Sequence, residues 1–174
     1  MGDYTIIALD PGGTTGWATF NADYVEGPDG AELYNAEWRC GQLDGGKHHK
    51  ELAILLEMNH TQHYQIVCES FEYRNRSRPG LELVSKEYIG VAELVAQDRK
   101  LPPVVYQTAA QGKVRNKTTA FVKPTNLKRL GLWIPGNDHA MDGYGHLLYY
   151  IIHSKRPEFR PLRHDLIEKG WRAS

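Results

Sequence analysis

Residues 4–21 constrain the fold more than any other part of the chain. They read YTIIALD, then PGGTTG, then WATFN, so two short apolar runs stand on either side of a segment rich in proline and glycine. Runs of this length bounded by Pro and Gly are typical of β-strands joined by a tight turn. The chain is therefore predicted to begin with a β-hairpin whose first strand ends in a carboxylate, Asp10.

The spacing of apolar residues in the rest of the chain predicts alternating strands and helices. In chain order these are a strand over 31–43, a helix over 45–63, a strand over 64–70, a helix over 81–98, a strand over 102–108, a basic connection over 109–133 with two short helical pieces, and a helix over 137–155. The order β-β-β-α-β-α-β-α predicts an α/β fold, with a five-stranded mixed sheet and helices on both faces.

Length and composition bound the class of protein. A chain of 174 residues with 41% hydrophobic and 24% charged residues is typical of one globular domain. We place that domain at residues 1–156 and treat 157–174, which are polar and interrupted by proline, as a C-terminal tail. No apolar run reaches the roughly 18 residues of a membrane helix and no signal peptide is recognisable, so a cytoplasmic protein without a membrane partner is expected. Cys40 and Cys68 lack the CxxC spacing of zinc or redox sites.

Charge is distributed unevenly, although the formal net charge is zero. Residues 1–69 carry 3 Lys/Arg and 11 Asp/Glu, residues 70–130 carry 12 and 5, and residues 131–174 carry 6 and 5. Between residues 99 and 137, eight Lys/Arg occur without any Asp or Glu. Such a stretch is more typical of a surface that contacts phosphate than of a randomly solvated surface, which favours a nucleic-acid partner.

Acidic residues occur at three positions that a mixed sheet can bring together. Asp10 ends the first predicted strand, Glu69 ends a later buried strand, and Asp142 lies in the first turns of the last helix. His139 and Asp138 precede Asp142 by three and four residues and so share its side of the helix. Alone, these residues would be a turn former, a strand end and part of a solvated helix surface. Their order and flanking elements together predict a cluster of carboxylates with one imidazole.

A cluster of carboxylates requires a counter-charge, because mutual repulsion raises the pKa values and destabilises the fold. Hard divalent cations supply that charge, and oxygen-rich sites favour Mg²⁺ or Mn²⁺. Two such ions about 3.5–4 Å apart stabilise the attacking and the leaving oxygen of a phosphoryl displacement. The pattern therefore predicts hydrolysis of phosphodiesters without a covalent enzyme intermediate.

Three segments, IIALDPGGTTGWA, IVCES and HAMDGYGHLLYYI, together resemble the RuvC-type Holliday-junction resolvases of the RNase H-like superfamily. The linking segments QTAAQGK and LKRLGLW resemble compact members encoded by phages, and the resemblance covers roughly residues 4–152. It implies an RNase H-like nuclease domain over 1–156 that nicks four-way DNA junctions in a bacterial cell, as a homodimer with two Mg²⁺ or Mn²⁺ per site. A C₂ dimer matches the approximate two-fold symmetry of the junction, and the helix over 81–98 is a candidate interface.

The resemblance also implies roles for individual residues. Asp10, Glu69, His139 and Asp142 would be catalytic metal ligands, with His139 at a position where some members carry His and others Asp. Asp138 would stand behind these ligands without binding metal itself. His146 and His153, on the same predicted helix, are expected to face solvent or to be hydrogen-bonded.

The loop after Glu69 departs from the pattern of cellular RuvC enzymes, which carry an aromatic residue near the junction crossover. This chain has FEYRNRSR there, whose aromatic rings can stack on unpaired bases and whose arginines can hold phosphates. The departure leaves cleavage-sequence preference and strict junction selectivity open. The candidate DNA-binding residues are Phe71, Tyr73, Arg74, Arg76 and Arg78 in this loop and Lys113, Arg115, Lys117, Lys123, Lys128 and Arg129 in the basic stretch.

Three alternatives compete with this interpretation. A nuclease of the same fold could act on forks, flaps and other branched DNA, because only the loops differ. A junction-binding module without cleavage is disfavoured, because all the carboxylate positions are filled. The turn DPGGTTG also resembles the first phosphate loop of actin-like and sugar-kinase ATPases, but these need two such domains and 174 residues are too few.

Overall fold

The computed structural model describes residues 2–27, 30–44, 48–58, 61–70, 79–114 and 120–172. Five strands span Gly2–Asp10 (β1), Thr14–Gly27 (β2), Gly30–Asp44 (β3), His63–Glu69 (β4) and Val105–Gln107 (β5). They form one sheet in the order β3-β2-β1-β4-β5. β1 pairs antiparallel with β2 and parallel with β4, while β2 pairs antiparallel with β3 and β4 pairs parallel with β5.

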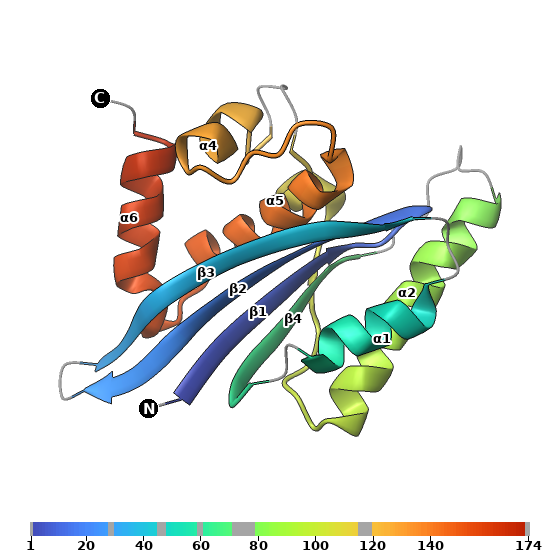
Figure 1. Ribbon diagram of the computed structural model, residues 1–174, viewed down its shortest axis with the longest axis horizontal. Helices are drawn as coiled ribbons and strands as arrows, with labels where there is room; N and C mark the ends of the chain where they lie inside the picture. The colour runs from blue at the N-terminus through green and yellow to red at the C-terminus, as the bar shows by residue number, and fades with distance from the viewer. Residues whose placement is uncertain are drawn as a thin grey trace.

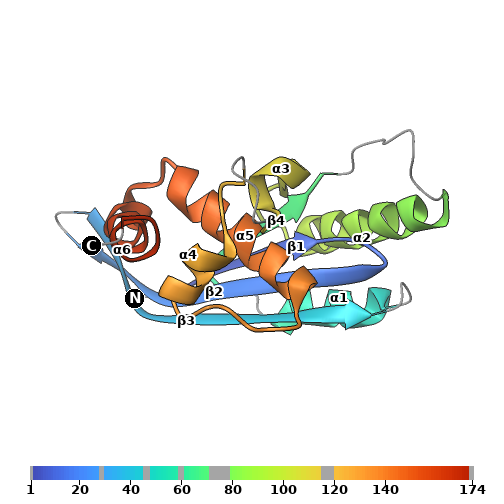
Figure 2. The same ribbon diagram turned by 90° about the horizontal axis from the view of Figure 1, so that it is seen from above.

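Helices cover both faces of this sheet. They span His49–Met58 (α1), Pro79–Asp98 (α2), Ala109–Gly112 (α3), Pro124–Arg129 (α4), Asp138–His153 (α5) and Arg160–Gly170 (α6). α1 and α2 lie on one face, whereas α5 crosses the other face with α3, α4 and α6 around it (Figure 1, Figure 2). Among the helices of the described ranges, none has both the length and the apolar character needed to cross a bilayer.

Side-chain alternation along the central strand β1 builds two hydrophobic cores. Tyr4, Ile6 and Ala8 belong to the core under α5, whereas Ile7 and Leu9 belong to the core under α1 and α2. Successive side chains of a strand point to opposite faces, so one strand contributes to both cores. The predicted α/β class, element order and mixed five-stranded sheet are confirmed.

The segment expected to be a polar tail folds onto the same core. Pro157–Phe159 forms a 3₁₀ turn that leads into α6, and the fully buried ring of Phe159 meets the Tyr4 ring edge-on at 5.3 Å. Leu166 of α6 is also buried in this core. The expectation for 157–174 therefore needs correction. Pro161 suggests an interruption, but it lies in the first turn of α6, where proline is compatible because the N–H there has no intrahelical partner.

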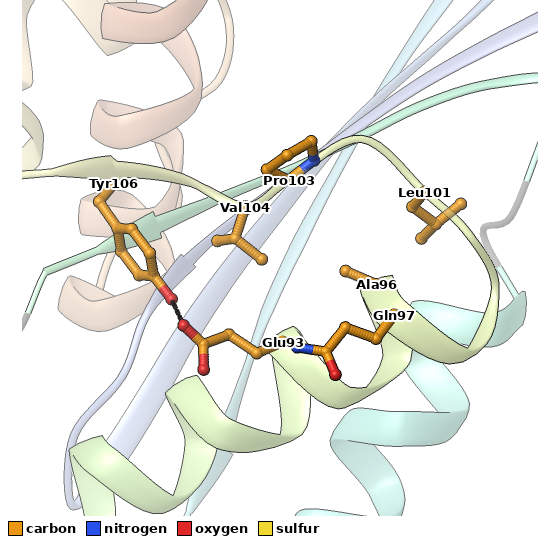
Figure 3. A pocket seen from close by; sticks show the side chains of 7 residues that line it. All are labelled: Glu93, Ala96, Gln97, Leu101, Pro103, Val104 and Tyr106. Atoms are coloured by element: carbon orange, nitrogen blue, oxygen red, sulfur yellow. Dashed lines mark hydrogen bonds between the residues drawn. The ribbon is translucent and has the colours of Figure 1, made fainter.

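A hollow of about 370 Å³ lies between α2 and residues 101–106. Figure 3 shows its lining, in which the Tyr106 hydroxyl donates a hydrogen bond of 2.6 Å to Glu93. The remaining lining side chains are mostly apolar. Because Tyr106 and Gln107 are successive residues of β5, they point to opposite faces, and the hollow opens on the α2 side.

Candidate active site

Asp10 and Glu69 end two neighbouring parallel strands, β1 and β4. Leu9 is in register with Cys68, so the next residue of each strand, Asp10 and Glu69, lies at the same edge of the sheet. Asp10 follows Ala8 onto the α5 side of the sheet by alternation. Its side chain is only 3% exposed. The strand ends therefore hold two carboxylates together in a mostly buried position.

The start of α5 reaches Asp10 through a close backbone approach at Gly16. Gly16 pairs with Asp10 across β1 and β2, and a Cβ on Gly16 would lie 1.8 Å from the carbonyl oxygen of His139. Without a side chain there, His139 Nδ1 lies 3.9 Å from Asp10 Oδ2, with the imidazole 48% exposed. Asp142, one turn further along α5, accepts a hydrogen bond of 2.7 Å from the backbone N–H of Val114.

Lys113, the residue after α3, joins three carboxylates. Its Nζ lies 2.8 and 3.0 Å from the two carboxylate oxygens of Asp10. The same nitrogen lies 3.5 Å from Glu69 Oε2 and 3.6 Å from Asp142 Oδ2. Asp10, Glu69 and Asp142 thus surround the Lys113 ammonium group, and we call these three acids together with Lys113 the acidic cluster.

His146 and Gln107 extend the cluster into the interior. The ring of His146 is completely buried, with Nε2 3.1 Å from Glu69 Oε2. Its Nδ1 lies 2.8 Å from Gln107 Oε1, and Gln107 Nε2 donates to the carbonyl oxygen of His146 at 3.2 Å. Gln107 is in register with Glu69 across β4 and β5, so both point toward α5.

The cluster shifts the pKa values of its members in different directions. Burial would raise the pKa of Asp10, but His139 and the Lys113 ammonium outweigh it and hold that pKa below its ordinary value. Burial would lower the pKa of Lys113, but the charges of Asp10 and Glu69 raise it. The Asp10 carboxylate raises the pKa of His139. Burial, together with the Asp10 charge, raises the pKa of Asp142 despite Lys113.

The donor set fits a divalent cation. Three carboxylates and one ammonium leave two negative charges uncompensated, and a buried cluster of that charge favours a divalent ion. Ligand atoms of Asp10, Glu69 and His146 all lie within 4.8 Å of one another. Carboxylate oxygens are the ligands that Mg²⁺ and Mn²⁺ prefer, and imidazole nitrogen is a common partner for transition metals.

The structure brings together four residues predicted as metal ligands or catalytic residues, Asp10, Glu69, His139 and Asp142, and it adds Lys113, which was predicted only as a contact to DNA. Asp138, the first residue of α5, is exposed. Lys123, next to α4, is half-buried. Seven predicted DNA contacts lie outside the described residues: Phe71, Tyr73, Arg74, Arg76, Arg78, Arg115 and Lys117.

His146 and Gln107 are site residues that sequence reasoning missed. Asp142 precedes His146 by four residues, so the two side chains lie on the same side of the helix. This spacing indicates that His146 faces the acidic cluster. Of the two states expected for His146, solvent-facing or hydrogen-bonded, the structure has the second. Gln107 carried no signal of its own, because its role depends on the pairing of β4 with β5.

Two solved structures of Thermus thermophilus RuvC are similar to this chain. One is 18% identical, and the other, in complex with a Holliday junction substrate, is 16% identical. Each comparison covers 84% of this chain and 92% of the RuvC chain, with a TM-score of 0.51. The chain has the RuvC fold. No family model and no curated protein matches the sequence.

The RuvC fold confirms, at the level of structure, the resemblance inferred from three sequence segments. The segments that carry Asp10, Glu69 and Asp142 form β1, β4 and α5, and these elements meet at the acidic cluster. The hollow of Figure 3 lies on the opposite face of the sheet, and its one carboxylate, Glu93, is hydrogen-bonded to Tyr106. The acidic cluster is therefore the better candidate for an active site.

Proposed function

We propose that this chain is a metal-dependent endonuclease that resolves four-way DNA junctions by paired symmetric nicks. The observation that carries the proposal is the meeting of Asp10, Glu69 and Asp142 around Lys113 at one end of the sheet. A further support is the shared fold with a RuvC structure that holds a Holliday junction substrate. The shared fold supports a DNA junction as the substrate, and the acidic cluster supports metal-dependent hydrolysis.

Asp10, Glu69, His139 and Asp142 would hold the divalent cations, Mg²⁺ or Mn²⁺, two at each site. When bound, such ions activate the attacking water and stabilise the leaving oxygen. Hydrolysis joins the water oxygen to phosphorus and breaks the bond to O3′, which takes up a proton. The products are a 5′-phosphate and a 3′-hydroxyl at each nick.

Lys113 and the basic residues beyond it would bind the DNA backbone. The Lys113 ammonium has three N–H donors, and at least one of them can donate to a phosphate oxygen once cations balance the carboxylates. α4 lies on the same face of the sheet as the cluster and carries Lys128 and Arg129 in its last turn. Contacts of this kind position a substrate without reading its sequence, as recognition of branch shape requires. The loop residues 71–78 keep their predicted role in stacking and phosphate binding.

We propose that two copies act as a homodimer through α2. Leu94 of α2 is 58% exposed and Tyr106 of β5 is 42% exposed, and the mostly apolar hollow lies on the same side of the sheet. Apolar patches on a protein surface are typical of interfaces, and the hollow is the apolar surface on which this proposal rests. A two-fold dimer would present two equivalent clusters to the two equivalent strands of a junction.

A second candidate function is an RNase H-like nuclease for forks, flaps and other branched DNA. The observation that favours it is the segment FEYRNRSR after Glu69, which departs from the pattern of cellular RuvC enzymes. The acidic cluster and its chemistry would be the same in both cases, because only the contacts around the branch differ.

The test is cleavage of a mobile four-way junction beside a Y-fork, a flap and a plain duplex of matched sequence, each with Mg²⁺, Mn²⁺ or EDTA. The proposal expects symmetric nicks confined to the junction and no cutting in EDTA. Equal cutting of forks and flaps would replace junction resolution by the second candidate. Cutting in EDTA would contradict metal dependence altogether.

A further inference from the structure

We infer that His146 is itself a metal ligand, which binds through Nε2 beside Glu69 and Asp10. The inference rests on the proposed use of divalent cations at the acidic cluster, but not on the DNA substrate. His146 lies one turn after Asp142 on α5, and its ring is completely buried against Glu69. Three observations carry the inference: the hydrogen position on the ring, the contact with Glu69, and the packing that fixes the ring.

Gln107 fixes which ring nitrogen of His146 carries hydrogen. Gln107 Nε2 donates to the carbonyl oxygen of His146, so the other atom of the same amide, Oε1, faces the ring. Oε1 lies 2.8 Å from Nδ1, and an amide oxygen can only accept, so Nδ1 must be the donor. In the neutral imidazole, Nε2 then carries a lone pair.

That lone pair is directed at a second acceptor. Nε2 lies 3.1 Å from Glu69 Oε2, and an ionised carboxylate offers only lone pairs. At this distance the two acceptors repel each other unless a proton or a metal cation lies between them. Neighbouring ligands of an octahedral ion with bonds of about 2.1 Å lie about 3 Å apart, and the pair has that separation. Asp10 brings a third ligand atom to the same spot.

The surroundings of the ring match those of a metal-binding histidine. Such histidines usually donate their other N–H to a nearby oxygen, which fixes the tautomer and the ring orientation. Gln107 Oε1 is that oxygen here. Gly112 packs flat against the ring, and a Cβ on it would lie 2.1 Å from ring atoms. The ring is thus held with Nε2 toward Asp10 and Glu69.

A nitrogen ligand changes which metal the site prefers. Imidazole favours transition metals, whereas Mg²⁺ prefers oxygen ligands. We therefore expect this chain to bind Mn²⁺ more tightly than Mg²⁺, and His146→Gln to weaken Mn²⁺ binding more than Mg²⁺ binding. Gln107→Leu removes the acceptor behind the ring and should lower Mn²⁺ affinity by about 10–100-fold. A histidine that only packs in the core would leave metal affinity unchanged in both variants.

The direct test is pulsed electron paramagnetic resonance of equimolar Mn²⁺ on the protein without DNA, which detects a nitrogen atom bonded to the ion. His139 is also a predicted ligand and would contribute its own nitrogen signal, so His139→Gln is the parent variant. Because the His139 side chain is half-exposed, this substitution should not disturb folding. We expect nitrogen coupling in His139→Gln and its loss in His139→Gln/His146→Gln. His153→Gln, an exposed position on the same helix, is the matched control and should retain the coupling.

Bound Mn²⁺ without nitrogen coupling in His139→Gln would overturn the inference and leave His146 as a proton-bridged partner of Glu69. This outcome needs no substitution in the core, so a failure of the double variant to fold does not remove the test. Lack of any Mn²⁺ binding would overturn the inference and the proposed metal dependence together. Nitrogen coupling in a protein that leaves junctions intact would support the inference while contradicting the proposed function.

Discussion

Lys113 and Asp10 are 103 positions apart, yet the Lys113 ammonium lies 2.8 and 3.0 Å from the two carboxylate oxygens of Asp10. By sequence the lysine belongs to the basic stretch, and by contact it belongs to the acidic cluster. The reason is that α3 packs on α5 and ends beside the cluster. A cation in this position stabilises carboxylates that would otherwise repel one another.

Replacing Lys113 should therefore destabilise the protein. We expect Lys113→Met to lower the free energy of unfolding in EDTA by about 2 kcal/mol, because charged hydrogen bonds to Asp10 are lost. Added Mg²⁺ should restore part of this loss by balancing the same carboxylates. Urea unfolding with and without Mg²⁺ measures both effects. Lys155→Met, at an exposed position, is the control. Equal stability of the two variants would mean that the lysine does not hold the cluster.

The lowered pKa of Asp10 predicts a particular dependence of stability on pH. Because the folded pKa lies below the ordinary value of 3.8, ionised Asp10 stabilises the fold above that value, and the contribution is lost as the pH falls further. In EDTA, wild type should be more stable than Asp10→Asn at pH 6, and the difference should shrink below about pH 4. The burial that raises the pKa of Asp142 acts in the opposite direction, but it is present in both proteins. A difference that stays constant with pH would contradict the prediction.

Much of the fold follows from local sequence signals. The strand, turn and strand of residues 4–21 became β1 and β2, because two short apolar runs on either side of a Pro-Gly turn leave few other options. The helix over 81–98 is observed as Pro79–Asp98, since its apolar spacing is long and regular. The last helix, α6, was not predicted, because Pro161 marks a helix start as readily as an interruption.

The site residues likewise divide into those with a clear local sequence signal and those whose contacts depend on the packing of distant elements. Asp10 and Glu69 could be found because a carboxylate at the end of an apolar strand is visible in the sequence. The four-residue spacing from Asp142 places His146 on the same side of α5, but its burial and contacts could not be predicted, because they depend on Glu69 of β4, Gln107 of β5 and the missing side chain of Gly112. The surroundings of the ring come from three separate elements, and no local sequence pattern encodes how these elements pack together.

Asp10→Asn should abolish cleavage while leaving DNA binding intact. The substitution removes a predicted metal ligand. Loss of a residue that only hydrogen-bonds to a metal ligand lowers metal affinity or activity by about 10–100-fold, so we expect the cleavage rate to fall by at least about 100-fold. Junction binding, measured by mobility shift in Ca²⁺, should be equal or stronger, because a charge that repels phosphate is gone. Asp98→Asn, at the exposed end of α2, is the control. Near-normal cutting by Asp10→Asn would remove Asp10 from the mechanism.

The basic residues around α4 should set the salt dependence of DNA binding. Lys123→Gln/Lys128→Gln removes two cations on the face of the sheet that carries the cluster. If both contact phosphate, the slope of log affinity against log salt should fall by about 1 for each lysine. Lys100→Gln, exposed after α2, should leave the slope unchanged. An unchanged slope in the double variant would place the DNA elsewhere.

A side chain added at Gly112 should disturb metal binding without contacting a carboxylate. A Cβ there would lie 2.1 Å from ring atoms of His146, so either the ring moves away from Glu69 or α3 moves together with Lys113. We expect Gly112→Ala to lower Mn²⁺ affinity in calorimetry by about tenfold or more, and to destabilise the fold by about 1–3 kcal/mol. Gly90→Ala is the matched control, since within the described structure nothing lies within 4 Å of its Cβ, and alanine in a helix stabilises by about 0.5–1 kcal/mol. Unchanged Mn²⁺ affinity in Gly112→Ala would mean that the His146 ring takes no part in holding the metal.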